Sequence, residues 1–79
     1  FPDTYYHMAR LKQKQGYYKG AIEDYTMALK QGGDALSIYY GRAQVFLEMG
    51  EISKACEDWQ RMNETNSRMA RQELRRYCE

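Results

Sequence analysis

The stretch that decides the fold is GYYKGAIEDY, residues 16–25, because it returns 34 residues later as GEISKACEDW, residues 50–59. The glycine, the alanine and the Glu-Asp pair are identical in both copies, and each copy ends on an aromatic residue. The same offset holds upstream, where three residues of one copy fall on their counterparts in the other: Tyr5, Tyr6 and Ala9 on Tyr39, Tyr40 and Ala43. A fixed period of this length indicates a stacked repeat protein in which each repeat is one supersecondary unit.

Helical spacing of apolar residues runs through the chain, and no segment alternates as a strand would. The clearest stripe occupies positions i, i+1, i+4, i+7 and i+8, namely Ala21, Ile22, Tyr25, Ala28 and Leu29. The pattern predicts five helices, the first from Pro2-Asp3 to about Gln15 and the second ending at Gly32-Gly33. The third starts at a capping Asp34 and ends at Gly50, the fourth runs to turn residues 63–67, and the fifth carries Ala70, Leu74, Tyr77 and Cys78. Alanines on the inner stripes are expected to let the helices approach closely.

Composition narrows the class of protein. Twelve Lys and Arg against eleven Asp and Glu give a net charge of +1, which argues against a nucleic-acid or anionic-membrane binder. The apolar runs are far shorter than the ~20 residues needed to span a bilayer. The chain begins at Phe1 without a methionine or a leader pattern, so we expect a mature product or a piece of a longer chain. A soluble protein is expected, with the cytoplasm slightly favoured as its compartment.

Catalytic and metal-binding patterns are missing from the sequence. No nucleophile–base pair, phosphate-cradling glycine loop or paired-carboxylate constellation is present, and His7 is the only histidine, too few for a metal site. We therefore predict no enzyme, no cofactor and no metal.

The repeated residues resemble the tetratricopeptide repeat (TPR) family. The first copy of the pattern is supplied by Tyr5, Ala9, Gly16, Tyr18, Ala21, Tyr25 and Ala28, and the second by Tyr39, Ala43, Gly50, Ile52, Ala55, Trp59 and Met62. The resemblance, which is to small bacterial TPR proteins or a C-terminal TPR fragment, implies one all-α domain over residues 1–79, built as a right-handed α-solenoid. Its repeats would span about 2–35 and 36–66, with a capping helix at about 67–78. The family's usual proline is replaced by Gly33 and Arg68, and Lys12 stands where an aromatic residue is common.

The resemblance also implies a concave groove lined by the first helix of each repeat. Its exposed residues here would be Tyr6, His7, Arg10, Gln13, Lys14, Ser37, Tyr40, Gln44 and Leu47. Since tyrosine and arginine are frequent anchors at interfaces, we predict a protein–protein interaction module, an adaptor or scaffold that binds a peptide or a helix. The alternative reading of these residues is a solvated face, or stacking between Tyr6 and Tyr40. Of the positions that hold a terminal carboxylate in some TPR groups, only Arg10 fits, so we expect no such clamp.

The two cysteines leave two interpretations open. If the fifth helix folds back along the fourth, Cys56 and Cys78 reach the same level and a disulfide is sterically conceivable. Buried free thiols that pack as small hydrophobic residues are the interpretation that we favour from sequence.

Two further functions remain as alternatives. Met8 and Leu11 are expected on the open side of the first hairpin, where a second copy could cover them in a homodimer. An RNA-binding helical repeat of the pentatricopeptide kind is the weaker alternative, because its period is 35 and its groove is basic, whereas this chain has a period of 34 and near-neutral charge.

Overall fold

The computed structural model describes residues 1–64 and 67–78, and these residues are organised in five α-helices. The helices are α1 (Pro2–Gln15), α2 (Tyr18–Lys30), α3 (Ala35–Met49), α4 (Ile52–Asn63) and α5 (Arg68–Tyr77). No strand occurs in the described part of the chain. The all-α prediction is therefore confirmed. It rested on the 3.6-residue spacing of apolar residues along the sequence.

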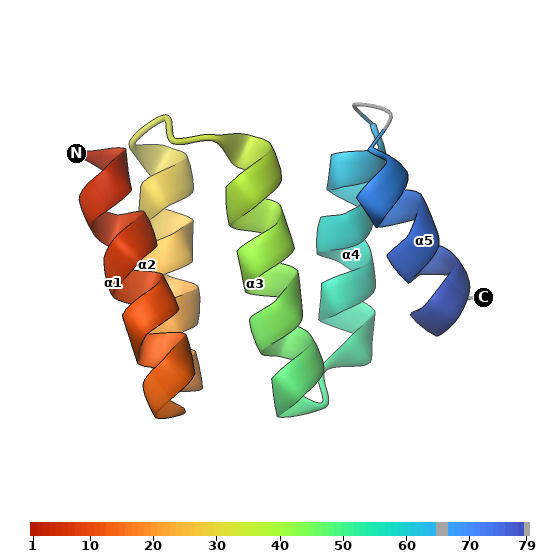
Figure 1. The fold of residues 1–79 in the computed structure, drawn as a ribbon, viewed down its shortest axis with the longest axis horizontal. Helices are drawn as coiled ribbons and strands as arrows, with labels where there is room; N and C mark the ends of the chain where they lie inside the picture. Colours follow the sequence, from red (N-terminus) through yellow and green to blue (C-terminus); the bar gives the residue numbers. More distant parts are fainter. Residues whose placement is uncertain (65–66, 79) are drawn as a thin grey trace.

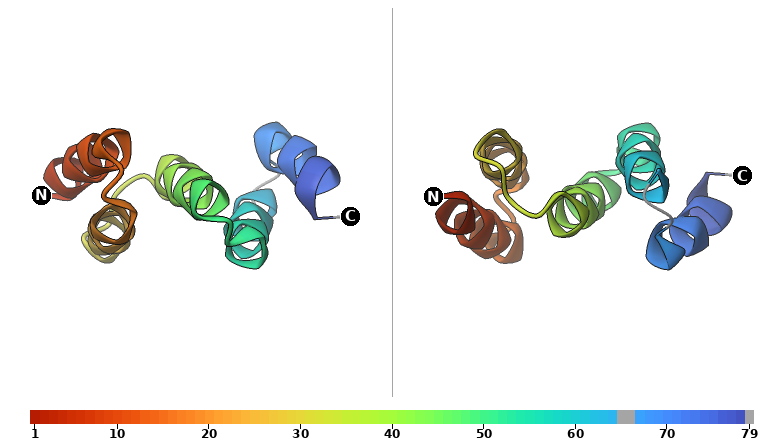
Figure 2. Two further views of the ribbon diagram at one scale, coloured as in Figure 1. Left: turned by 90° about the horizontal axis from the view of Figure 1, so that it is seen from below. Right: turned by 90° about the horizontal axis from the view of Figure 1, so that it is seen from above.

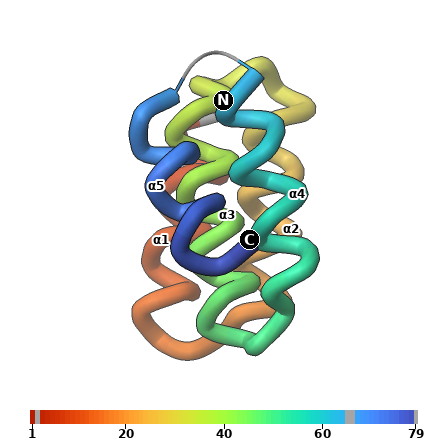
Figure 3. Tube along the Cα trace, turned by 90° about the vertical axis from the view of Figure 1, so that its right-hand side faces the viewer, coloured from red at the N-terminus to blue at the C-terminus, as the bar shows by residue number. Residues whose placement is uncertain are grey.

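The helices lie side by side in a row, and each packs against the next one in the sequence (Figure 1). Seen along the helix axes, the row forms a zigzag with α1, α3 and α5 on one side and α2 and α4 on the other (Figure 2). The slab measures 33 × 25 × 14 Å, and the two termini lie at opposite ends of the row. Viewed from the end of the row, α5 lies beside α4 (Figure 3). One side of the slab is thus built entirely from odd-numbered helices.

One turn joins the two helices of each hairpin, and the two turns are equivalent. Gly16 has φ 83° and Gly50 has φ 82°, in the left-handed region that glycine enters without steric cost. After each glycine a backbone amide closes the helix end, Tyr17 N donating to Lys12 O at 2.8 Å and Glu51 N to Phe46 O at 2.8 Å. The repeated glycines of the sequence therefore end α1 and α3 in the same way, as predicted.

The acidic residues at the starts of α1 and α3 make no side-chain cap hydrogen bonds, although we expected one from Asp34. Phe1 holds the N-cap position of α1, and Asp3 lies exposed within the first turn. Asp34 does occupy the N-cap of α3, but its side chain makes no cap hydrogen bond to the helix. Its Oδ2 instead accepts a hydrogen bond from Ser37 Oγ at 2.6 Å. Asp3 can still favour the positive end of the α1 dipole from its place in the first turn.

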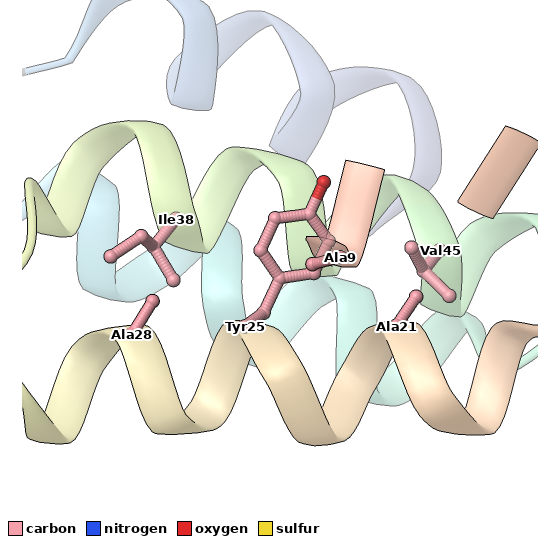
Figure 4. Packing of buried hydrophobic residues seen from close by; sticks show 6 residues of the cluster. All are labelled: Ala9, Ala21, Tyr25, Ala28, Ile38 and Val45. Carbon is pink, nitrogen blue, oxygen red and sulfur yellow. The ribbon is translucent and has the colours of Figure 1, made fainter. Parts of the chain in front are cut away.

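The core consists of two clusters, one between the hairpins and one under α5. In the first cluster, Tyr25 of α2 lies between Ala21 and Ala28 and faces Ile38 and Val45 of α3 (Figure 4). The second cluster gathers around Trp59 and contains Ala43, Ala55, Met62 and Ala70. The predicted inner alanines are fully buried, which allows the close approach of neighbouring helices.

Candidate binding groove

A groove of about 530 Å³ lies between α1, α3 and the start of α5. Most of its lining residues belong to α1, α3 and α5, and these helices form one side of the slab (Figure 2). Three helices therefore supply its lining, and buried side chains of α2 and α4 reach it as well. The lining residues are Tyr6, Arg10, Gln13, Tyr25, Asp34, Leu36, Ser37, Tyr40, Gly41, Gln44, Met62, Ser67 and Met69.

Aromatic rings give the groove a fixed surface. Tyr6 is half-buried and meets the buried Tyr25 edge to face, with ring centroids 5.9 Å apart. The guanidinium of Arg10 lies 5.9 Å from the centroid of the Tyr6 ring, a position suited to a cation–π contact. An exposed cation is thereby held next to an aromatic wall.

A short chain of hydrogen bonds fixes one end of the groove. The Tyr25 hydroxyl donates to Gln13 Oε1 at 3.0 Å, and Gln13 Nε2 donates to Glu48 Oε1 at 3.1 Å. Burial raises the pKa of Tyr25 to about 12, with a smaller contribution from the nearby Tyr6. Tyr25 therefore stays a neutral hydrogen-bond donor at physiological pH.

Gly41 allows Tyr25 to pass beneath α3. A Cβ built at Gly41 would lie 2.6 Å from Cζ of Tyr25, closer than real carbon atoms approach. The ring of Tyr25 thus occupies the space that a side chain at this position would need. Sequence reasoning missed this contact, although a glycine inside a helical pattern often marks close packing.

Charges are separated along α1. A hollow of about 260 Å³ adjoins the groove at the start of α1 and is lined by Asp3, His7 and Asp34, among others. Arg10 and Lys14 line a further hollow toward the end of α1, where Glu48 is the acidic residue. The hollow at the start of α1 is thus lined by two carboxylates, whereas the hollow toward its end holds two cations and Glu48.

The structure gathers most of the predicted groove residues in one place. Six of them line the groove itself: Tyr6, Arg10, Gln13, Ser37, Tyr40 and Gln44. His7 lies in the adjoining hollow at the start of α1, and Lys14 lies in the hollow near its end.

Leu47, the remaining predicted groove residue, is not among the residues that line the groove. Leu47 is half-buried and packs against the cluster around Trp59. The physical reason is helical spacing, since Leu47 follows the buried Ala43 by four residues and lies on the same inward face.

Ion pairs to two buried aspartates beside the core were also missed. The Arg42 guanidinium forms a bidentate contact with Asp58, with Nε to Oδ2 at 2.8 Å and Nη2 to Oδ1 at 2.7 Å. The hydrogen bond to Asp58 raises the pKa of Arg42 above its usual value.

The other repeat has an ion pair as well, in which Lys12 Nζ lies 2.8 Å from Asp24 Oδ2. Lys12, which departs from the family pattern, thus has a structural partner. The sequence feature that could have indicated these ion pairs is the aspartate that precedes an aromatic residue in both copies, Asp24 before Tyr25 and Asp58 before Trp59.

Cys56 and Cys78 form a disulfide, with the sulfur atoms 2.06 Å apart and the Cα atoms 6.0 Å apart. The free-thiol interpretation that we favoured was wrong, because the two cysteines are bonded to each other. The bond is possible because α5 folds back along α4 (Figure 3). The cytoplasmic preference stays a prediction, and the disulfide argues against it, since such bonds are rare in cytosolic proteins.

Within residues 1–64 and 67–78, no three His, Cys, Asp or Glu side chains come together as metal ligands. None of the helices that the structure describes has the length and apolar character to cross a bilayer. Comparison of the chain with protein-family models, with curated proteins and with solved structures found no match.

Proposed function

We propose that the chain is a non-catalytic protein–protein interaction module that binds a peptide or an amphipathic helix in the groove between α1, α3 and α5. The observation that carries the proposal is the groove itself, about 530 Å³ in volume with walls from three helices. The 34-residue period and the two equivalent glycine turns support a TPR-like stack as its framework. An adaptor or scaffold is the function that follows from these features.

The groove offers an occupant both apolar and polar contacts. Leu36 and Met69 are exposed at its edge, on α3 and α5 respectively. Tyr40 is half-buried within it, and Arg10 stands next to the ring of Tyr6. Tyrosine and arginine supply large contact areas and directional bonds, which is why they are frequent hot spots at interfaces.

Substituting groove residues tests this function. Peptides of about twelve residues would be selected from a random display library against the full chain, synthesised, and measured by isothermal titration calorimetry. Leu36→Glu and Arg10→Glu should each weaken binding of a selected peptide at least about tenfold, because each places a new carboxylate where the peptide would desolvate it. Tenfold corresponds to about 1.4 kcal/mol.

Ile52→Glu is the matched control for Leu36→Glu. Ile52 lies in the first turn of α4 and is 44% exposed, against 40% for Leu36 in the first turn of α3. Binding should be unchanged in this variant, because Ile52 is not among the residues that line the groove. Equal loss of affinity in the control, or none in the groove variants, would place the binding surface elsewhere.

Self-association is a second candidate function, favoured by the outer face of α1. Met8 and Leu11 are both exposed there, three residues apart and so neighbours on one helical face. A two-fold arrangement would let this face cover its own copy. We expect the solution mass from light scattering to rise toward a dimer with concentration, and Leu11→Glu to hold it at the monomer. Met49→Glu, at another exposed apolar residue, is the control and should leave the dimer intact.

A further inference from the structure

α5, the last helix of the row, is short and buries few of its side chains. α5 is ten residues long, shorter than the ~12–15 residues at which isolated helices persist in water. Ala70 is its fully buried residue, while Leu74 is half-buried. Its four arginines are exposed. Contact with α4 must therefore supply most of the stability of α5.

The two ends of α5 are held in different ways. Ser67 caps the start of α5 by accepting a hydrogen bond from Ala70 N at 3.2 Å. At the other end, Cys78 follows Tyr77 as the C-cap residue and is bonded to Cys56 in α4. The bridge therefore fastens the C-terminal end of α5. Both cysteines are half-buried rather than fully buried, so part of each residue is in contact with solvent.

Trp59 lies beneath the fastened end of the helix. Its ring stacks on Tyr77, with centroids 5.5 Å apart and an interplanar angle of 22°. It is the only tryptophan of the chain, and its exposure is 0%. The indole Nε1 is buried without a hydrogen-bond partner, a cost of burial that water would relieve once the ring is uncovered. Moving Tyr77 away would expose it to water.

We propose that the Cys56–Cys78 bridge is a reversible modification site, and that reduction by a dithiol releases α5 from α4. The bridge accepts two electrons and two protons to give two thiols, while the dithiol loses them and closes to its own disulfide. A disulfide donor reverses the step. Release uncovers the apolar surface around Trp59 and withdraws Met69 and Ser67 from the groove. The effect on the groove rests on the proposed function, whereas the release of α5 does not.

Amide hydrogen exchange of the full chain tests the release without any ligand. Adding dithiothreitol should raise exchange of residues 68–78 at least about tenfold, while exchange in α1 and α2 stays as in the oxidised protein. Trp59 emission should shift to longer wavelength over the same reduction. The Cys56→Ser, Cys78→Ser double variant should behave as the reduced protein and ignore the reagent, which controls for effects of dithiothreitol elsewhere.

Three outcomes separate the parts of the proposal. Unchanged protection of residues 68–78 after reduction would overturn the release of α5. An equal rise in exchange across all five helices would also overturn it, because the bridge would then stabilise the whole fold and not one helix. Release of α5 with undiminished affinity for a selected groove peptide would support the modification site and overturn the role of α5 as a groove wall.

Discussion

Replacing Arg42 with alanine should lower the free energy of unfolding by about 3–5 kcal/mol, the cost of leaving a buried charge without its partner. Asp58 is the charge concerned, because its side chain is 3% exposed and both of its oxygens bind the guanidinium. Small domains have a total stability of about 5–15 kcal/mol. A large fraction of the stability is therefore lost, and urea denaturation followed by circular dichroism would measure it.

The ion pair at the equivalent aspartate of the other repeat, Asp24, provides the control. Lys12→Ala removes the partner of Asp24, but the Lys12 side chain is 35% exposed, so water screens this pair. We expect a cost of about 1 kcal/mol or less. A cost for Arg42→Ala no larger than for Lys12→Ala would show that burial does not set the strength of these pairs. Adding Asp58→Asn to Arg42→Ala should recover part of the loss, because the unpaired charge is removed.

Gly41→Ala is the second change with a large expected effect. In an exposed helix interior the substitution would add about 1 kcal/mol of stability, because alanine is the better helix former. Here the new methyl group would lie 2.6 Å from Cζ of Tyr25, so either the ring or α3 must move. Overpacking of this kind costs about 1–3 kcal/mol. The net result should be a lower midpoint in urea.

Gly20→Ala is the same chemical change in a more tolerant place. The nearest atom to its new Cβ is Cδ of Lys12 at 3.1 Å, part of a flexible side chain that can shift. This variant should match or exceed the wild-type stability. A double-mutant cycle of Gly41→Ala with Tyr25→Leu isolates the contact, and a coupling energy near zero would contradict the steric explanation.

The sequence was sufficient for the features that repeat locally. Helix ends were predictable because glycines at matching positions admit positive φ, as Gly16 and Gly50 do. The groove face was predictable because helical spacing sets which side chains share a side, as for Tyr6 and Arg10. The resemblance to the TPR family supplied the expectation that this face is concave.

Features that depend on contact between distant residues could not be predicted in the same way. Asp24 and Asp58 are equivalent in the repeat, yet their partners Lys12 and Arg42 come from different positions of the preceding helix. The spacing of residues along a helix does not specify which cation will pair with each aspartate. Likewise, the disulfide of Cys78 required the direction of α5 relative to α4, which a turn in the sequence does not specify.

The arrangement of the five helices in a row has a consequence for how the chain folds. Packing joins each helix chiefly to its neighbour in the sequence, so native contacts form by closing short loops. Short loops lose little chain entropy on closure, and chains rich in local contacts cross a low barrier to the native state. Order can therefore start in one hairpin and pass along the row, each helix adding to a surface that the previous one has already built.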